Sequence, residues 1–374
     1  MRLAAYVQLW RMRPPFTGVS RHAVSMLRGL AAGGSVTVIG AAPDLDRDGR
    51  IPPDSGLAGF PVIRLPLAGQ KLEKIWHFCN FPKAETWAPG FDWIYTPTEC
   101  FIPTRRSKLA VTVHDLMPLE TDLPWSATPG HQRMQRRWQL KFRPIVKRAR
   151  LFLAVSDFTK QRLVNLLGIE PDRIAVVGNG VDEMFFAPPP AETERGRSLR
   201  GGNPTVLITG GLTAKKGGAA VLAVAEELLR RESPLRFIVV GFHNDEHLLQ
   251  RSRSLPNVVH AGHVNDDEYH SLLGHSACLL FLSRYEGFGI PIMEAMAMGT
   301  PVVASTFASI PEVVGDAGYL VDAGRSEEIA DLLQEIADNP AGAAALVARG
   351  RERAARCRWS NCVERLERAF AEHS

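Results

Sequence analysis

The stretch Phe281 to Ser305, FLSRYEGFGIPIMEAMAMGTPVVAS, decides the fold. Its apolar start predicts a buried strand that ends at Ser283, and the Gly-Phe-Gly turn leads into a helix over Ile290 to Met298. Pro291 suits the first turn of that helix, where an amide hydrogen would have no helical partner. A second apolar run, Pro301 to Ala304, predicts the next strand. Strand, helix and strand in this order indicate a parallel α/β sheet.

The same alternation extends outward along the chain in both directions. Helical spacing of apolar residues predicts helices over Gly18 to Leu30 and Gly217 to Arg231. Short apolar runs predict strands at Leu3 to Val7, Val36 to Ile39, Trp93 to Tyr95, Leu109 to Val113, Leu151 to Val155, Thr205 to Thr209, Leu235 to Val240, Val258 to His260 and Cys278 to Leu282. We therefore expect two doubly wound, Rossmann-like parallel-sheet domains that face a central cleft.

The domain boundaries follow from a break in this rhythm. Ala187 to Pro204 (APPPAETERGRSLRGGNP) contains three consecutive prolines and mixed charges but no apolar periodicity, which is typical of a linker. The prediction is a first domain over 1–182, a linker over 183–204 and a second domain over 205–356. Residues from Arg325 onward have a helical pattern, and a last helix within 357–374, beginning at Trp359, is expected to return to the first domain.

Composition limits the class of protein. The chain has 374 residues, of which 45% are hydrophobic and 22% charged, so a disordered chain is excluded. No apolar run approaches the roughly 20 residues that span a bilayer, and the 5 cysteines have neither disulfide nor zinc spacing. We expect a cytoplasmic protein. Residues 1 to 187 hold 25 Lys and Arg against 16 Asp and Glu, so the basic half could face anionic lipid.

Two carboxylates flank the glycine-rich turn of the quoted stretch. Glu286 comes just before the turn and Glu294 lies one turn into the helix, where both could accept hydrogen bonds from the hydroxyls of a sugar or a ribose. Backbone N–H groups at the start of the helix favour an anion such as a diphosphate. Taken alone, the pattern fits an ordinary strand-to-helix turn with solvated glutamates equally well.

The stretch closely resembles the E-x7-E signature of the family 4 glycosyltransferases, which are retaining enzymes of the GT-B fold that use nucleotide-sugars. The resemblance, which is to the mannosyltransferase-like group, covers nearly the whole chain. It continues through motifs that stand in the order of the family, namely Thr17-Gly18-Val19-Ser20-Arg21, Val113-His114-Asp115-Leu116, Val155 to Lys160, Asn179-Gly180-Val181-Asp182, Gly210 to Gly217 and Gly315-Asp316-Ala317-Gly318.

The resemblance implies a role for each matching residue. Glu294 is expected to bind the nucleotide ribose, while Lys216, Lys215 and Gly211 would bind the diphosphate. Lys215 stands where many members have arginine, which keeps the charge but loses a bidentate donor. The loop with Gly18 would approach the diphosphate and the acceptor. The donor sugar would contact His114, Asp115, Glu286, Gly287, Phe288 and Gly289, and Asp115 could orient the ring of His114. His114, Glu286 and Lys216 are the catalytic candidates.

The same resemblance implies the reaction. A hexosyl or deoxyhexosyl group would pass with retention, without a metal or other cofactor, from a nucleotide-sugar to a glycan or lipid-linked acceptor in surface polysaccharide or lipopolysaccharide synthesis. GDP-mannose or a related GDP-sugar is favoured and a UDP-sugar comes second, with no nucleic-acid partner expected. The alternatives are a GT-B nucleotide-sugar epimerase and a non-catalytic nucleotide- or sugar-binding protein. No G-x-G-x-x-G follows the first strand, which argues against a dehydrogenase.

Three other charged segments have spacings that suggest binding or metal chemistry. Residues 131–150 (HQRMQRRWQLKFRPIVKRAR) carry eight Lys or Arg with Met134, Trp138, Phe142 and Ile145 on one helical face. That pattern fits peripheral contact with an anionic inner membrane face, or packing of the apolar face on the chain's own sheet, which is slightly favoured. The D-x-D spacings from Asp44 to Asp48 indicate a loop rather than a metal site. His243 and His247 have helical spacing but lack the glutamate of a zinc motif.

Overall fold

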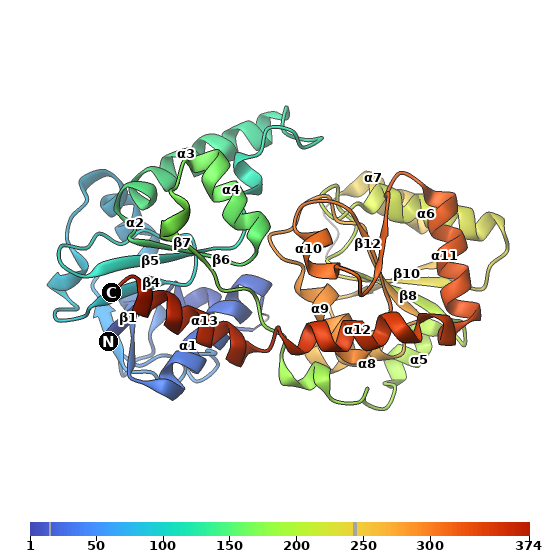
Figure 1. Cartoon of the computed structure of the whole chain (residues 1–374), viewed down its shortest axis with the longest axis horizontal. Helices are drawn as coiled ribbons and strands as arrows, with labels where there is room; N and C mark the ends of the chain where they lie inside the picture. The colour runs from blue at the N-terminus through green and yellow to red at the C-terminus, as the bar shows by residue number, and fades with distance from the viewer. Residues whose placement is uncertain (15, 242–244) are drawn as a thin grey trace. The chain divides into compact units, whose positions relative to one another are not determined.

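The structure is a computed structural model that describes residues 1–14, 16–241 and 245–374. The chain forms two compact units (Figure 1). The first consists of residues 1–180 together with 359–374, and the second of residues 181–358. The chain passes from one unit to the other twice, after Gly180 and after Arg358, so the first unit is completed only by the last residues of the sequence.

A parallel sheet of seven strands forms the centre of the first unit, in the order β3-β2-β1-β4-β5-β6-β7. β1 lies between β2 and β4, with Leu3 opposite both Val36 and Trp93. Because the strand order reverses direction at β1, the unit is doubly wound. The strands are β1 Leu3–Tyr6, β2 Val36–Ala41, β3 Val62–Leu65, β4 Trp93–Thr96, β5 Lys108–Val113, β6 Leu151–Ala154 and β7 Ile174–Val176.

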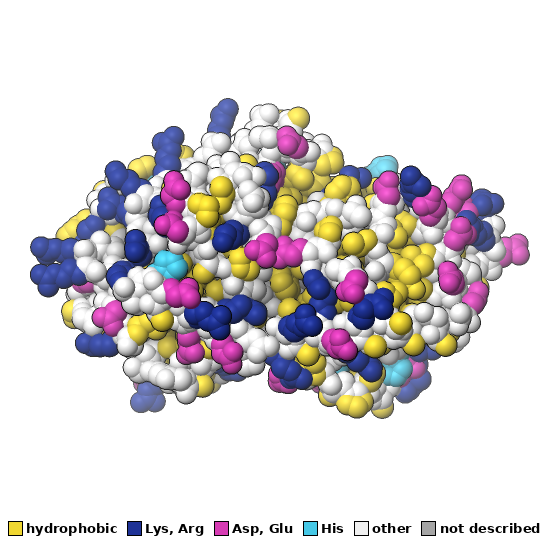
Figure 2. Space-filling view, in the orientation of Figure 1, with side chains coloured by type: hydrophobic (Ala, Val, Ile, Leu, Met, Phe, Trp, Pro, Cys, Tyr) yellow, Lys and Arg dark blue, Asp and Glu magenta, His cyan; other side chains and the backbone are white. Residues whose placement is uncertain are grey.

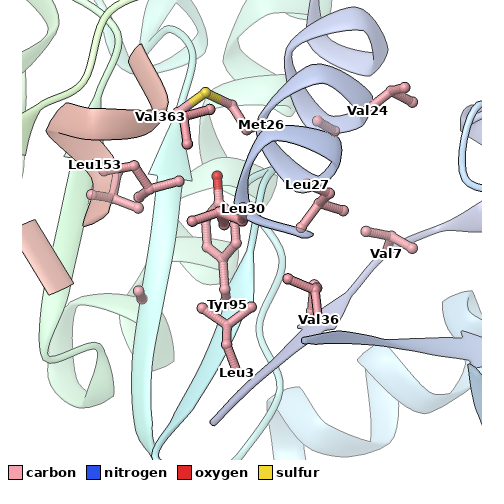
Figure 3. Close-up of a cluster of buried hydrophobic side chains, with 14 of the residues drawn as sticks. Leu3, Val7, Val24, Met26, Leu27, Leu30, Val36, Tyr95, Leu153 and Val363 are labelled. Carbon is pink, nitrogen blue, oxygen red and sulfur yellow. The ribbon is translucent and has the colours of Figure 1, made fainter. Parts of the chain in front are cut away.

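Helices cover both faces of this sheet. On one face α1 (Gly18–Gly33) and α13 (Trp359–Glu372) bury Leu27, Leu30 and Val363 against Leu3 and Val36 (Figure 3). The other face carries α2 (Gly69–Cys79), α3 (Pro129–Arg148) and α4 (Asp157–Leu167). Side chains of β1 alternate between the two cores, as a strand buried on both faces requires.

The second unit has a parallel sheet of six strands in the order β10-β9-β8-β11-β12-β13. Its strands are β8 Thr205–Thr209, β9 Arg236–Val240, β10 Val258–Gly262, β11 Cys278–Phe281, β12 Val302–Ser305 and β13 Tyr319–Val321. Its helices are α5 Glu194–Arg200, α6 Gly218–Arg230, α7 Glu246–Arg253, α8 Asp266–Gly274, α9 Ile290–Met298, α10 Ile310–Val314, α11 Ser326–Asp338 and α12 Ala344–Ala355. In Figure 1, α6, α7 and α11 lie on one side of this sheet and α8, α9 and α12 on the other.

Two segments differ from the sequence prediction in detail. The stretch expected to be a linker contains the short helix α5, whose sequence ERGRSLR offers no apolar face. Arg195 anchors this helix by hydrogen bonds to Glu268 and to the carbonyl oxygen of Ala261. The helical pattern after Arg325 is divided into α11, α12 and α13, with a turn at Pro340 between the first two. The last helix begins at Trp359, as predicted.

Candidate functional site

The loop between β8 and α6 brings Lys216 to the carboxyl end of the second sheet. Gly210 and Gly211 have φ of +84° and +75°, which glycine adopts without a steric penalty. Gly217, at φ +69°, caps α6, and a Cβ there would lie 2.1 Å from the carbonyl oxygen of Leu282. The loop can therefore approach the end of β11 only with glycine at this position. Lys215 and Lys216 lie in the turn before the helix.

Lys216 and Glu286 form an ion pair at this edge of the sheet. The Nζ atom of Lys216 lies 2.7 Å from Oε1 of Glu286, and 5.2 Å from the ring centroid of Phe281. The two side chains are 23% and 13% exposed, so the pair is mostly shielded from water but accessible at one side. β8 and β11 are neighbours in the sheet, which explains how two residues 70 positions apart meet.

The glycine-rich turn before α9 is tied to its surroundings by backbone contacts. Gly289 caps α9 with a φ of +109°, and Pro291 lies in the first turn as predicted. The Ser309 hydroxyl lies 2.9 Å from the carbonyl oxygens of both Glu286 and Phe288 and can donate to either. These contacts hold the turn that precedes the first amides of α9, which have no partner within the helix.

A hydrogen bond also links this turn to the lysine loop. The amide of Arg284 donates to the carbonyl oxygen of Lys215 at 2.8 Å. The lysine loop is therefore attached to the end of β11 in two ways, by the backbone of Lys215 and by the side chain of Lys216. The amide of Lys216 donates to Oγ1 of Thr213 at 3.1 Å, which fixes the lysine at the end of its turn.

Glu294 has a different partner from Glu286. It is buried, at 5% exposure, and its Oε2 accepts a hydrogen bond from the hydroxyl of Tyr269 on α8 at 3.0 Å. The ring of Tyr269 meets Phe185 edge to face. Neither Tyr269 nor Ser309 was predicted, because the sequence carries no spacing signal that relates α8 or the segment after β12 to these glutamates.

In the first unit His114 follows β5 directly, at the carboxyl end of that strand. The ring is buried, and its Nε2 donates to the carbonyl oxygen of Pro97 at 2.9 Å, since a carbonyl can only accept. Its backbone amide donates to Oε1 of Glu99 at 2.7 Å. The Oδ1 atom of Asp115 accepts from the amide of Met117. The carbonyl oxygen of Pro97 thus fixes Nε2 of the ring, and the orientation of the ring by Asp115 stays a prediction.

A second histidine, which no sequence motif indicated, packs against His114. The rings of His22 and His114 meet edge to face with centroids 4.8 Å apart. His22 is fully buried, and its Nδ1 lies 2.7 Å from Oδ1 of Asn179, to which it donates. Burial, and to a lesser degree the neighbouring His114, lowers the pKa of His22 well below its usual value. His22 is therefore neutral near pH 7.

Gly18 is the first residue of α1 rather than part of a free loop. Thr17 caps the helix, and its side chain and that of Ser20 exchange hydrogen bonds with each other's amides. A cavity of about 540 Å³ lies beside the start of this helix, and aromatic and basic side chains are among those that line it. It is lined by Trp10, Arg11, Met12, Arg13, Pro14, Thr17, Val19 and Ser20.

The other charged segments take structural roles. Oδ1 of Asp46 accepts from the amides of Asp48 and Arg50 within its own turn. Within residues 1–14, 16–241 and 245–374, no group of three or more His, Cys, Asp or Glu side chains could hold a metal ion. His243 lies outside the described residues. Over the same described ranges no helix combines the length and the hydropathy needed to cross a bilayer.

Comparisons with known proteins fall on both units. Residues 16–185 match the family model of glycosyltransferase family 4, and residues 203–339 match that of the glycosyl transferases group 1. Together these matches cover most of the chain. The chain belongs to glycosyltransferase family 4. The resemblance of its motifs to this family is thereby confirmed.

The relatives of this family 4 glycosyltransferase include mannosyltransferases. It is 26% identical to the O-antigen chain mannosyltransferase B of Escherichia coli, over 95% of this chain and 96% of that protein. It is 32% identical to the phosphatidyl-myo-inositol mannosyltransferase of Mycolicibacterium smegmatis, over 58% of this chain and 56% of that protein.

Solved structures share the fold of this family 4 glycosyltransferase. HepE of Anabaena in complex with UDP-glucose has a TM-score of 0.71 and 18% identity over the full length of both chains. WaaG, a glycosyltransferase involved in lipopolysaccharide biosynthesis, has a TM-score of 0.68 and 16% identity over 99% of both chains. The predicted GT-B class with two Rossmann-like units is confirmed.

Proposed function

We propose that this glycosyltransferase moves a hexosyl or deoxyhexosyl group, with retention and without a metal, from a nucleotide-sugar to a glycan or lipid-linked acceptor in surface polysaccharide synthesis. The observation that carries the proposal is the Lys216–Glu286 pair at the carboxyl ends of neighbouring parallel strands, beside the capped start of α9. Ligands of open α/β sheets bind at this end of the strands.

The second unit is proposed to hold the donor. Lys216 and Lys215, with the first amides of α9, would neutralise the diphosphate. Glu286 and the turn Gly287-Phe288-Gly289 would contact the sugar, and Glu294 would accept from the ribose hydroxyls. GDP-mannose is the favoured donor because the relative that matches along nearly its whole length is named a mannosyltransferase. The UDP-glucose complex of HepE keeps a UDP-sugar as the second choice.

The chemistry proposed is a front-face displacement. The bond between the anomeric carbon and the diphosphate oxygen breaks while the acceptor oxygen bonds to that carbon from the same face, and the acceptor proton passes to the departing phosphate oxygen. Lys216 would stabilise the charge that develops on the diphosphate, where a charged hydrogen bond contributes about 1.5–3 kcal/mol. His114, fixed by Pro97, would contact the donor sugar.

The first unit is proposed to hold the acceptor. The cavity beside α1 offers the exposed ring of Trp10 for stacking on a sugar, and Arg11 and Arg13 for an anionic group. We further propose that the enzyme works in the cytoplasm and that residues 131–150 bring it against an anionic inner membrane face. Arg136, Arg137, Lys147 and Arg148 are exposed there.

The proposal is tested by ligand binding followed by product analysis. A thermal-shift screen of GDP, UDP and their sugars should raise the melting temperature with one nucleotide, because a ligand at 100 times its dissociation constant adds about 2.7 kcal/mol. The matched sugar is then incubated with lipid-linked acceptor, and the anomeric configuration of the product is read by NMR. An inverted product, an epimerised free nucleotide-sugar, or no shift with any nucleotide would contradict it.

A further inference from the structure

Large apolar side chains are exposed on α2 and in the segments next to it. Among the described residues, eight large hydrophobic side chains are exposed, and four of these lie between residues 67 and 81. Phe78 is 83% exposed and Phe81 is 64% exposed, the two highest values of this set. A fifth member, Leu140 on α3, lines a cavity of about 350 Å³ together with Phe78. Apolar side chains gathered in this way mark an interaction surface.

The same surface is basic. Arg143, Lys147 and Arg148 line the cavity with Phe78 and Leu140, so the apolar and basic groups lie side by side. Figure 2 shows many Lys and Arg side chains on the visible face of the first unit, with Asp and Glu side chains among them. We define the α2–α3 surface as Lys71, Lys74, Ile75, Phe78, Phe81, Lys83, Leu140, Arg143, Lys147 and Arg148.

The acidic residues nearby are engaged elsewhere. On α2, Glu73 accepts from the hydroxyl of Tyr6 at 2.8 Å and from the side-chain amide of Gln8 at 2.6 Å. Glu85 accepts from three successive backbone amides, those of Arg105, Arg106 and Ser107. Glu73 makes its hydrogen bonds away from the basic side chains, whereas Glu85 partly offsets the charge of Lys83 alone. Partial burial, and then the neighbouring Arg148, lowers the pKa of Lys83, as expected where cations are crowded.

The apolar face of α3 is already occupied. Phe142 and Ile145 are buried in the core beneath the first sheet, and Trp138 packs on the same core. This confirms that the apolar face of 131–150 packs on its own sheet, so α3 has basic residues to offer a partner but few apolar ones. The apolar contribution comes instead from α2 and from the turn that follows it, through Phe78 and Phe81.

We propose that the α2–α3 surface docks on a membrane of anionic phospholipid, with Phe78 and Phe81 entering the acyl boundary and the basic side chains meeting the lipid phosphates. This inference deepens the peripheral membrane contact proposed above and rests on that part of the proposed function. The positive charge of the surface favours an anionic membrane over a second copy of the chain, because the second copy would present the same positive charges and the two surfaces would repel each other. Aromatic insertion beside a basic surface is how monotopic proteins bind a bilayer.

Vesicle sedimentation of the full chain tests the proposal. Binding is expected to vesicles of phosphatidylcholine with 30% phosphatidylglycerol and to be at least about tenfold weaker with phosphatidylcholine alone. Phe78→Ser with Phe81→Ser, and Lys147→Glu with Arg148→Glu, should each lower the partition coefficient about tenfold or more. The matched controls are Leu320→Ser, an exposed apolar residue of the second unit, and Arg47→Glu with Arg50→Glu, exposed bases of another loop.

A depth measurement separates insertion from charge attraction. Brominated acyl chains should quench the emission of the Phe78→Trp variant more than that of the unchanged chain, whose 7 tryptophans set the background, and should quench the Leu320→Trp variant no more than that background. Equal binding of the double phenylalanine variant, or equal quenching of both probes, would overturn the proposal. So would light scattering that shows a dimer dissociated by Phe78→Ser, since the surface would then meet a second copy. Nucleotide affinity, measured by calorimetry on the same variants, should stay unchanged, which keeps this result separate from the test of glycosyl transfer.

Discussion

The Nζ atom of Lys216 lies 2.7 Å from Oε1 of Glu286, across the ends of two neighbouring parallel strands. The two residues have different proposed partners on the donor, the diphosphate for the lysine and the sugar for the glutamate. A diphosphate would compete with Glu286 for the ammonium of Lys216. With these proposed partners the pair would couple the two ends of the donor, because a lysine that turns to the phosphate leaves the carboxylate available to sugar hydroxyls.

Lys216→Met is predicted to weaken nucleoside diphosphate binding by about tenfold or more, equivalent to about 1.4 kcal/mol, and to lower turnover by at least the same factor. Binding of the matching nucleoside should change little, because it has no diphosphate. Calorimetry with both ligands measures the difference. Arg325→Met, an exposed cation of the second unit, serves as the control. Equal losses for both ligands would place the lysine elsewhere than at the diphosphate.

Glu286→Gln should separate sugar contact from nucleotide binding. The amide keeps the size of the side chain but releases Lys216 from its ion pair. We expect unchanged or tighter binding of the nucleoside diphosphate, together with turnover of the nucleotide-sugar lowered about tenfold or more. Steady-state kinetics and calorimetry on one preparation measure both quantities. Weaker diphosphate binding combined with normal turnover would contradict the assignment.

Glu294→Ala is predicted to weaken nucleotide binding, including that of the nucleoside alone, because the contact proposed is with the ribose. Tyr269→Phe should give a smaller loss in the same direction, since it removes the hydroxyl that donates to Oε2 of Glu294. A 2′-deoxynucleotide provides the internal control, because its affinity should respond less to Glu294→Ala. Equal losses of affinity for the ribonucleotide and the deoxyribonucleotide would contradict the proposed contact between Glu294 and the ribose.

The sequence predicted the local elements well but could not supply strand order. Lys216 and Glu286 each followed from a strand-to-helix motif, yet their contact depends on β8 and β11 being neighbours, which no local pattern encodes. The Tyr269–Glu294 bond and the His22–His114 contact join separate helices and strands for the same reason. The helix α5 was not predicted because its sequence lacks the apolar periodicity that indicates other helices. Polar contacts of Arg195 anchor it instead.

His22 predicts a specific dependence of stability on pH. Its pKa is lowered in the folded protein, so between that value and about 6.5 the unfolded chain binds a proton that the folded chain does not. Stability should therefore be fully present above about pH 6.5 and fall as the pH drops, by at most about 1.4 kcal/mol per pH unit. Urea unfolding at several pH values should give a shallower slope for His22→Gln. Parallel slopes for the two proteins would show that His22 does not contribute.

Gly217→Ala should destabilise the second unit severely. The added Cβ would lie 2.1 Å from the carbonyl oxygen of Leu282, and the residue has a φ of +69°. Gly202→Ala is the matched control, because its φ is +79° but no heavy atom lies within 4 Å of the added Cβ. The free energy of unfolding of the control should fall by only about 1–2 kcal/mol, which is the cost of a Cβ in the left-handed backbone conformation. Similar melting temperatures for the two variants would contradict the close approach of the lysine loop to β11.

Phe370 tests how the end of the chain completes the first unit. The centroid of its buried ring lies 5.0 Å from that of Trp93 and 5.8 Å from that of Tyr95. Phe370 belongs to α13, which follows the second unit in the sequence but packs in the first. Phe370→Ala should cost about 3–5 kcal/mol through the cavity that it leaves. Hydrogen exchange should then speed up for amides of β1 and β4 but not for those of β8 and β9, because the two units have separate cores. Phe237→Ala, in the core of the second unit, should give the reverse pattern. Faster exchange in both sheets with either variant would mean that the units unfold together.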